Sequence, residues 1–252
     1  MSVTIVTHNA YWFQGAPTLW PEERAAARPE VIDRLAEFYA GLAPDLLCLQ
    51  EVPDEQVAAE LAGRLAMHFC FAKGGKLATY GAAIFSKPDT GELRNLTEQV
   101  GPAERTCLRG VVRGECSVLN VLAVHLPSNR YAPFEQAERQ RVAELTAALN
   151  LAGEVDVVVG DFNSTPGSAP YRFMIEREFR DAAELGNCTN RLTGAKHRVD
   201  YIWLGPRVAR VFGGLRVLGP EGFAAELGGR ERMLSDHYPL VLELEGTVGS
   251  AG

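Results

Sequence analysis

Short runs of almost uninterrupted apolar residues recur along the chain, and β-branched residues are common in them. They predict strands at 3–7, 46–49, 81–85, 118–124, 155–159, 199–204 and 239–244. Because apolar side chains occupy both alternating faces of most runs, we expect these strands to be covered on both sides. Such a pattern is typical of a layered α/β or α+β domain.

Segments with a helical period of apolar residues lie between several of these runs. Apolar and charged positions alternate with that period at about 21–39, 55–66 and 133–151. The pattern therefore predicts helices that separate the strands along the chain.

Polar residues able to take part in chemistry stand where the apolar runs begin or end. In chain order they are Asn9, Glu51, His125, Asp161, Asn163, Asp236 and His237. Catalytic and binding groups are often found on loops at one edge of a rigid sheet. We therefore expect these strand ends to converge on one rim of the molecule.

The composition bounds the architecture. The chain has 252 residues, of which 46% are hydrophobic, so a sizeable buried core is available. There is no long Pro/Gly/Ser linker, low-complexity tract or fixed-period repeat. We predict one domain over 1–252, with 246–252 as a frayed tail, and a monomer, because no coiled-coil pattern is visible.

The formal net charge of -7 limits the classes of partner. A protein that holds nucleic acid through a large uniform basic surface must neutralise many phosphates, which this charge disfavours. A nuclease is not excluded, because an acidic metal site contributes negative charge that its cation offsets locally.

Cysteine usage and the N-terminus bear on the compartment. The five cysteines are odd in number, widely spaced and without a C-x-x-C pair, which favours reduced thiols. The N-terminal residues lack the features of a secretory signal, and no uncharged apolar run approaches the ~20 residues that cross a bilayer. We predict a soluble, cytoplasmic protein with no membrane span.

Glu51 directly follows a run that predicts a buried strand. A carboxylate there is costly unless it is solvated, hydrogen-bonded or bound to a cation such as Mg²⁺. Taken alone, a solvated or capping role fits Glu51 as well as metal binding does.

Residues 160–163 (GDFN) are more specific. Asp161 and Asn163 are separated by one residue and can project to the same side of an extended turn. A carboxylate beside a carboxamide suits activation of a water and contact with a phosphate oxygen. The alternative is an Asx turn that starts a following helix.

Histidines accompany carboxylates near the last predicted strand. Asp236 and His237 are adjacent, so in extended chain they point to opposite faces and have separate tasks. A catalytic histidine needs a partner that fixes its tautomer, and Asp200 is the best candidate for His237. For His125, taken alone, a core or capping role is the more common case. His8, His68 and His197 are interpreted as structural or surface residues.

Taken together, these motifs resemble the endonuclease/exonuclease/phosphatase superfamily, which includes DNase I-like nucleases, inositol polyphosphate 5-phosphatases and neutral sphingomyelinases. The matching segments, in the order of the family, are 7–9 (THN), 49–51 (LQE), 124–126 (VHL), 160–163 (GDFN), 199–202 (VDYI) and 235–237 (SDH). The resemblance spans nearly the whole chain. It implies a four-layer α/β/β/α sandwich of two mainly antiparallel, DNase I-like sheets flanked by helices.

The resemblance also implies roles for the site residues. Glu51 would be the principal ligand of Mg²⁺, or of Mn²⁺, with Asn9 and Asp236 assisting directly or through water. Asp161 and Asn163 would orient the nucleophile and a phosphate oxygen.

The two histidines have implied roles as well. His125 and His237 would contact non-bridging oxygens or transfer protons, with Asp200 orienting His237. The resemblance leaves open whether Asp161 or His237 is the general base.

The substrate implied is a phosphate ester. A phosphodiester of nucleic acid or a nucleotide is the first choice and a phospholipid or inositol phosphate the second. The chain lacks an acidic residue two positions after Asn9, which abasic-site endonucleases use, and this argues against a DNA-repair role. A non-catalytic binding module with the same fold is an alternative of another class, but none of the expected ligands or histidines is missing.

Several residues near the expected rim could distinguish these substrates. Basic loops would favour nucleic acid, and the candidates, each of which fits an ordinary helix or loop charge equally well, are Arg130, Arg139, Arg141, Arg191, Lys196 and Arg198. Exposed aromatic residues at 11–13 or Trp20 would favour a lipid, although core packing is the more common role of any one of them. Glu104 and Arg105 resemble a charged stretch that approaches the site in DNase-like members, or form a solvated charge cluster.

Overall fold

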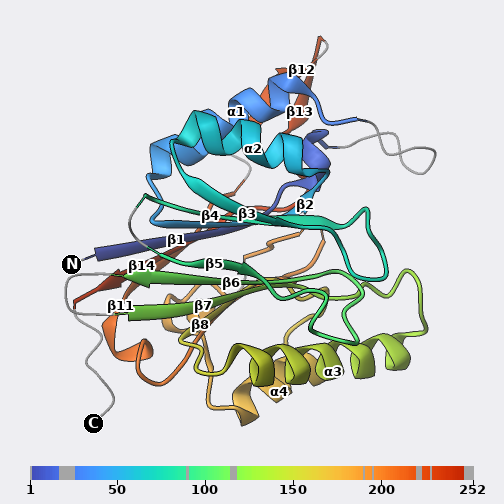
Figure 1. Ribbon diagram of the computed structural model, residues 1–252, viewed down its shortest axis with the longest axis vertical. Helices are drawn as coiled ribbons and strands as arrows, with labels where there is room; N and C mark the ends of the chain where they lie inside the picture. Colours follow the sequence, from blue (N-terminus) through green and yellow to red (C-terminus); the bar gives the residue numbers. More distant parts are fainter. Residues whose placement is uncertain are drawn as a thin grey trace.

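The computed structural model describes residues 2–16, 26–88, 91–113, 118–189, 191–194, 196–219, 223–227 and 229–246. Two six-stranded sheets pack face to face, and helices cover the outer face of each (Figure 1). The four-layer α/β/β/α sandwich predicted from the sequence is therefore confirmed.

The first sheet has β1 at its centre. Its strands, in spatial order, are β11 (Phe212–Val217), β14 (Leu240–Glu245), β1 (Ser2–Asn9), β2 (Leu46–Val52), β4 (Gly81–Ser86) and β3 (His68–Ala72). Neighbours are antiparallel except for β1 and β2.

The second sheet has the same plan. Its order is β5 (Leu93–Asn95), β6 (Thr106–Arg113), β7 (Val118–His125), β8 (Val157–Asp161), β10 (Asp200–Leu204) and β9 (Arg180–Asp181). Here β7 and β8 are the parallel pair. The prediction of two mainly antiparallel sheets is confirmed, and a separate hairpin is formed by β12 (Ala224–Leu227) and β13 (Arg230–Met233).

Helices are divided between the two outer faces (Figure 1). The first sheet is covered by α1 (Pro29–Leu42) and α2 (Glu55–Leu65), and the second by α3 (Phe134–Ala152) and α4 (Ala169–Glu176). A short α5 (Ala182–Leu185) and two 3-10 turns, Tyr11–Phe13 and Ala209–Val211, complete the described helical structure. No helix in the described part of the chain is long and apolar enough to cross a membrane.

Three apolar layers account for the continuous hydrophobicity of the strands. Between the sheets, Ile5 and Leu242 pack with Val121, Val159 and Ile202. A second layer lies between α1, α2 and the first sheet, and a third between α3, α4 and the second sheet. Because each central strand buries both of its faces, alternation of apolar and polar residues is absent.

The predicted elements all correspond to observed ones, with corrections at their ends. The predicted helix at 21–39 begins only at Pro29, because proline suits the first turn of a helix, and 26–28 are non-helical. Residues 21–25 and the tail at 247–252 lie outside the described residues. The four described cysteines, Cys48, Cys70, Cys107 and Cys188, form no disulfide, as predicted, and Cys116 lies outside the described part.

The register of the strands brings their polar ends to one edge. In the second sheet, His125 at the end of β7 lies opposite Asp161 at the end of β8, which lies opposite Asp200 at the start of β10. In the first sheet, Asn9 at the end of β1 lies opposite Gln50 in β2.

Gly160 makes the close approach of β7 and β8 possible next to Asp161. Its φ is +129°, and a Cβ added there would lie 1.9 Å from the carbonyl oxygen of Val124. Only glycine adopts this backbone conformation at low cost.

We expect Gly160→Ala to reduce the free energy of unfolding by on the order of 3 kcal/mol or more, because both backbone and packing must shift. Urea denaturation measures the change. Gly63→Ala is the matched control, because a Cβ at this position in α2 meets nothing within 4 Å and should stabilise by about 0.5–1 kcal/mol. Equal stability of Gly160→Ala and wild type would contradict the assigned packing.

Candidate active site

A cleft of about 860 Å³ lies at the edge where the strand ends converge. Its lining residues are Tyr11, Trp12, Ala16, Glu51, Tyr80, Arg105, Ser128, Arg130, Asp161, Asn163, Lys196, Met233, Ser235, Asp236, His237 and Tyr238. Asn9, His125 and Asp200, the remaining residues predicted for the site, are buried behind this lining. The structure therefore brings together all the residues that the sequence placed on one rim.

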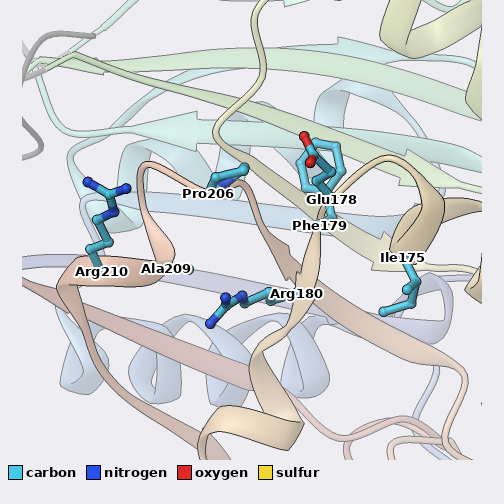
Figure 2. A pocket seen from close by; sticks show the side chains of 7 residues that line it. All are labelled: Ile175, Glu178, Phe179, Arg180, Pro206, Ala209 and Arg210. Atoms are coloured by element: carbon cyan, nitrogen blue, oxygen red, sulfur yellow. The ribbon is translucent and has the colours of Figure 1, made fainter. Parts of the chain in front are cut away.

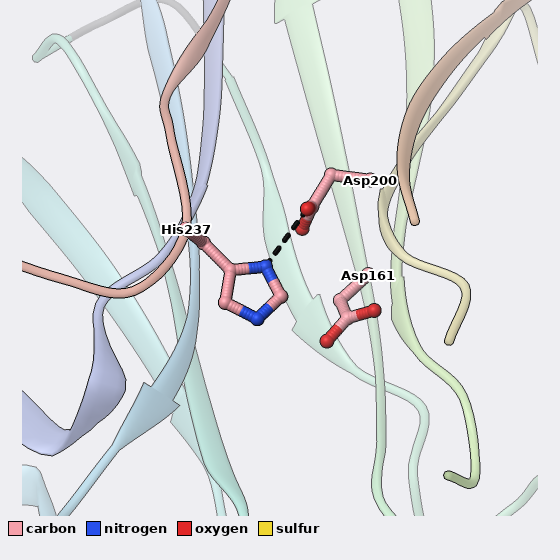
Figure 3. A group of neighbouring side chains, drawn as sticks. All are labelled: Asp161, Asp200 and His237. Carbon is pink, nitrogen blue, oxygen red and sulfur yellow. Dashed lines mark hydrogen bonds and ion pairs between the residues drawn. The ribbon is translucent and has the colours of Figure 1, made fainter. Parts of the chain in front are cut away.

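Two side-chain hydrogen bonds cross from one sheet to the other at this edge. Asn9 Nδ2 donates to Asp161 Oδ2 over 3.1 Å. His237 Nδ1, just before β14, lies 2.8 Å from Asp200 Oδ2 in β10 (Figure 3). Since a carboxylate accepts, the ring donates from Nδ1, which fixes its orientation.

The turn after β8 is an Asx turn. Asp161 Oδ1 accepts a hydrogen bond from Asn163 N over 2.8 Å, and Asn163 Nδ2 donates to the carbonyl of Leu126 over 3.1 Å. Asn163 has a φ of 49°, a conformation that asparagine tolerates better than most residues. The turn does not start α4 directly, because that helix is capped by Ser168. It aims Asp161 and Asn163 into the cleft.

His237 is surrounded by acidic groups. Burial disfavours its charged form, but Asp200, Asp161 and Asp236 outweigh that effect and raise the pKa of His237 well above its ordinary value. Its Nε2 lies 3.9 Å from Asp236 Oδ1. This shift favours the imidazolium form, in which both ring nitrogens are donors.

His8 supports His237 from behind, as the structural role predicted for it requires. Its Nε2 donates to the backbone carbonyl of His237 over 3.2 Å, and its Nδ1 accepts from the hydroxyl of Tyr39 over 2.6 Å. Burial lowers the pKa of His8 to about 3, so this ring is neutral and holds one tautomer.

Glu51 is a carboxyl group whose charged form is disfavoured by its surroundings. It occupies a bulge of β2 with a φ of 55° and is 7% exposed. Burial raises the pKa of Glu51 to about 8, although the positive charge of Arg105 opposes the shift. A bound cation would relieve the cost of keeping this carboxylate charged.

Asp236 is a second carboxylate whose hydrogen-bonding capacity is only partly used. Burial raises its pKa, and its buried Oδ1 has no hydrogen-bond partner among the described residues. Together with Glu51 and the amide oxygen of Asn9, it offers oxygen ligands, which are those that Mg²⁺ and Mn²⁺ prefer. The residues at this edge therefore fit a hard divalent cation.

A second grouping involves Asp161, Asp200 and His237, whose ligand atoms all lie within 4.8 Å of one another (Figure 3). The hydrogen bond to Asp200 occupies one ring nitrogen of His237, and the high pKa keeps a proton on the other. This arrangement is that of a hydrogen-bonded relay rather than of an imidazole ligand, which must be neutral.

Arg105 stands at the floor of the cleft, where the sequence left open a solvated charge cluster. It is 3% exposed, so that alternative is wrong for Arg105. Its guanidinium hydrogen-bonds to Nε2 of His125, lies 4.0 Å from Glu51 Oε1, and stacks 4.0 Å from the ring centroid of Tyr80. Burial and this cation lower the pKa of His125 to about 4, so His125 is neutral.

The surroundings of Asp161 favour its ionised form. Burial alone would raise its pKa, but His125, His237 and Arg105 outweigh burial and hold the pKa of Asp161 below its ordinary value. His125 Nε2 lies 3.3 Å from Asp161 Oδ2. Asp161 is therefore ionised throughout the neutral range.

The other basic candidates separate into three groups. Arg130 and Lys196 line the cleft. Arg141 and Arg198 are buried in ion pairs with Glu138 and Asp181, so neither serves as a rim charge. A charged residue in a predicted helix is usually exposed, so the sequence did not indicate that Arg141 is buried. Arg139 and Arg191 are exposed.

The aromatic residues at 11–13 are mainly structural. Trp12 and Phe13 are buried, whereas Tyr11 is half-buried in the cleft wall. All three have a positive φ, near 50°, which is unusual for aromatic residues and stores backbone strain beside the site. Trp20 lies outside the described residues.

Helix α3 holds the loop that follows β7, a feature that sequence reasoning missed. Arg141 donates from Nε to the carbonyl of Pro127 over 2.6 Å and also hydrogen-bonds to Asn129. Its ion-pair partner Glu138 accepts from the backbone N–H of Ala169 over 2.6 Å, at the start of α4. One buried pair thus fixes two loops that reach the cleft.

The same helix holds the segment before Arg105. Gln140 donates to the carbonyl of Pro102 over 2.7 Å, and Glu144 accepts from the backbone N–H of Glu104 over 2.9 Å. Burial raises the pKa of Glu144 to about 7, although Gln140 and the Glu104 N–H partly offset the effect by hydrogen bonding.

A further depression of about 560 Å³ lies between α4, β9 and the 3-10 turn Ala209–Val211 (Figure 2). Its lining combines Ile175, Phe179 and Pro206 with the charged Glu178, Arg180 and Arg210. This depression contains none of the residues predicted for the site. Glu178 is its only lining carboxylate, so it offers no cluster of acidic groups like that of the cleft.

Comparison with known proteins agrees with the layered fold. Residues 6–237 match the family described as the Endonuclease/Exonuclease/phosphatase family. A comparison with curated proteins gave no match.

Solved structures share this architecture. A family protein from Bacteroides thetaiotaomicron is 15% identical, with 97% of each chain covered and a TM-score of 0.69. The human Nocturnin catalytic domain with bound sulfate anion is 19% identical over 96% of this chain and 93% of that chain, with a TM-score of 0.66. Humanized TDP2 of D. rerio is 18% identical over 97% and 99%, with a TM-score of 0.64. At these identities the likeness concerns the fold.

The pKa of Glu144 gives a pH dependence of stability that can be measured. Because its folded-state pKa is above the unfolded value, its contribution is fully present below about pH 4.5 and is lost as pH rises toward 7. We expect Glu144→Gln, which cannot ionise, to gain on the order of 1–3 kcal/mol relative to wild type between pH 5 and 8 in urea denaturation. Glu135→Gln, exposed on the same helix, is the control, and parallel profiles of wild type and Glu144→Gln would contradict the assignment.

Proposed function

The chain belongs to the endonuclease/exonuclease/phosphatase family, and from that premise we propose that it is a divalent-metal-dependent phosphoesterase that hydrolyses a phosphodiester. The observation that supports this most is the convergence of Glu51, Asp161, Asp236 and His237 on one cleft. The Oδ1 atom of Asp236 is buried and makes no hydrogen bond to the described residues, which suits a cation ligand.

The proposed metal ligands are Glu51 and Asp236, with Asn9 assisting directly or through water. Mg²⁺ or Mn²⁺, when bound, supplies positive charge that polarises the phosphate and favours ionisation of water. Asn9 Oδ1 also accepts from the backbone N–H of Tyr11 over 3.1 Å, which holds the amide oxygen in a fixed orientation.

Asp161 is proposed to orient the attacking water and accept its proton. Its low pKa keeps it ionised, and the hydrogen bonds from Asn9 Nδ2 and Asn163 N fix both of its oxygens. Asn163 would contact a phosphate oxygen beside it. As the new P–O bond forms, the bond to the leaving oxygen breaks on the opposite side of phosphorus.

His237 is proposed to act as a donor, because its raised pKa favours the imidazolium and Asp200 occupies its other nitrogen. It would hydrogen-bond a non-bridging oxygen or protonate the leaving oxygen. Of the two candidates for general base, Asp161 is the one whose pKa shift keeps it unprotonated and able to accept a proton.

Arg105 and His125 would complete the phosphate site from the floor of the cleft. A buried guanidinium is a permanent cation, and stacking on Tyr80 restricts its orientation. Charge that gathers on the phosphate oxygens as phosphorus becomes five-coordinate would be met by a donor already in place.

The substrate is proposed to be a nucleic acid or nucleotide. Arg130 and Lys196 line the cleft and suit phosphates that flank the scissile one. A phospholipid or inositol phosphate is the alternative, because the lining also includes apolar side chains such as Trp12 and Met233.

We expect Mg²⁺- or Mn²⁺-dependent hydrolysis of bis-p-nitrophenyl phosphate, abolished by EDTA and restored by added metal. Glu51→Gln and His237→Ala should each lower kcat/KM by roughly 10²-fold or more, as loss of one preorganised electrostatic contact does in other enzymes. Glu55→Gln and His68→Ala, both exposed, are matched controls expected to keep wild-type rates. Full activity in both site variants, or activity indifferent to EDTA, would refute the proposed function.

A further inference from the structure

An exposed tyrosine stands in a fixed position at the rim of the cleft. Tyr131, in the loop between β7 and α3, is 51% exposed. Its hydroxyl lies 2.9 Å from that of Tyr80, and the two rings are nearly perpendicular, with centroids 6.4 Å apart. An exposed side chain usually retains rotamer freedom, so this restraint prepares a flat surface before any ligand arrives.

Tyr80 connects that surface to the floor of the site. It is 3% exposed, lines the cleft, and packs edge-on against Trp12 and His125, with centroid distances of 5.2 and 5.9 Å. The guanidinium of Arg105 lies over its ring. Tyr80 therefore links Tyr131 to Arg105 and His125, the groups proposed to face the phosphate.

The loop that carries Tyr131 is itself anchored. Arg141 hydrogen-bonds to Pro127 and Asn129 within it, and Arg130, the residue before Tyr131, lines the cleft. The exposed ring of Tyr131 thus lies next to the cation Arg130 on an anchored loop. The buried ring of Tyr80 separates Tyr131 from Arg105 at the floor of the cleft. Proteins that bind single-stranded nucleic acid combine these two groups, because bases stack on aromatic rings and cations follow the backbone.

We propose that Tyr131 is a stacking platform for a nucleobase next to the scissile phosphate, with Arg130 beside the adjoining phosphate. This proposal rests on the proposed function and makes it more specific. The substrate class is a single-stranded nucleic acid or an oligonucleotide, because bases paired in a duplex are already stacked and do not offer a free face to one ring.

The surroundings favour a base over an acyl chain. Large exposed apolar residues in the described part are Val118, Tyr131, Phe134, Leu151, Ile175 and Leu192. Phe134, 60% exposed at the first residue of α3, follows Tyr131 by three residues, whereas Leu151 lies at the far end of α3 and Ile175 in α4. A membrane-facing rim requires a wide contiguous apolar surface, whereas a ring held in place through its hydroxyl suits a flat polar base.

The experiment compares a single-stranded oligonucleotide with the same strand carrying abasic residues on both sides of one phosphodiester. For wild type with Mg²⁺, we expect cleavage at the base-flanked phosphodiester to have a KM roughly tenfold lower than at the abasic one, the effect of one stacked base. Tyr131→Ala should bring this ratio close to one, chiefly through KM, and Tyr131→Trp should restore it. Leu151→Ala, an exposed apolar residue elsewhere, is the matched control and should leave the ratio at the wild-type value.

Binding without turnover provides an independent measurement. With EDTA present, fluorescence of 2-aminopurine in the strand should be quenched by wild type and less so by Tyr131→Ala. Quenching that persists when no substrate is hydrolysed with any metal would support the stacking site while refuting the proposed function.

Three results would overturn the stacking site. One is an equal KM for base-bearing and abasic strands in wild type. Another is a ratio that Tyr131→Ala leaves unchanged. The third is Tyr131-dependent binding to phosphatidylcholine vesicles without quenching of the oligonucleotide, which would make this rim a lipid surface.

Discussion

Contact between the ends of two separate sheets is the constraint on which the site depends. The hydrogen bonds from Asn9 in β1 to Asp161 and from His237, just before β14, to Asp200 connect the first sheet to the second. The apolar layer between the sheets sets the distance over which these short side chains must reach. A shift of one strand by a single residue would turn its polar end to the other face. Precise packing of the core therefore decides the geometry of the site.

Electrostatic cost is concentrated at the same edge. Glu51, Asp161 and Asp200 are buried carboxyl groups and Asp236 is half-buried, and burial alone would raise the pKa of each. Arg105 and His237 compensate only part of this charge. The negative charge that remains uncompensated suits a divalent cation. The same buried charge lowers the stability of the fold.

Much of this arrangement could be predicted from the sequence. The strands that bury both faces stood out as continuous apolar runs, and the site residues stood out because they are polar directly at the ends of those runs. Strands such as β6 and β3 were missed because Arg109 and Gly110 interrupt the first and the second is short and half-exposed. Local pattern does not reveal a strand whose apolar surface is completed by distant partners.

The supporting residues could not be predicted in the same way. Arg105, Glu138, Arg141 and Glu144 are charged, and charge in a helix or loop usually indicates solvent exposure. Their burial depends on partners far along the chain, such as His125 for Arg105 and Ala169 for Glu138. The residues of the site could be predicted from the sequence. The hydrogen bonds and ion pairs that hold them in place could be found only from the three-dimensional structure.

Direct measurement of cation binding tests the central claim most closely. Titration with Mn²⁺, followed by electron paramagnetic resonance in the absence of substrate, compares wild type with Glu51→Gln and Glu55→Gln. We expect saturable binding by wild type and Glu55→Gln, and an affinity lower by roughly tenfold or more for Glu51→Gln. Equal Mn²⁺ affinity in all three proteins would contradict the claim that the converging strand ends hold the cation.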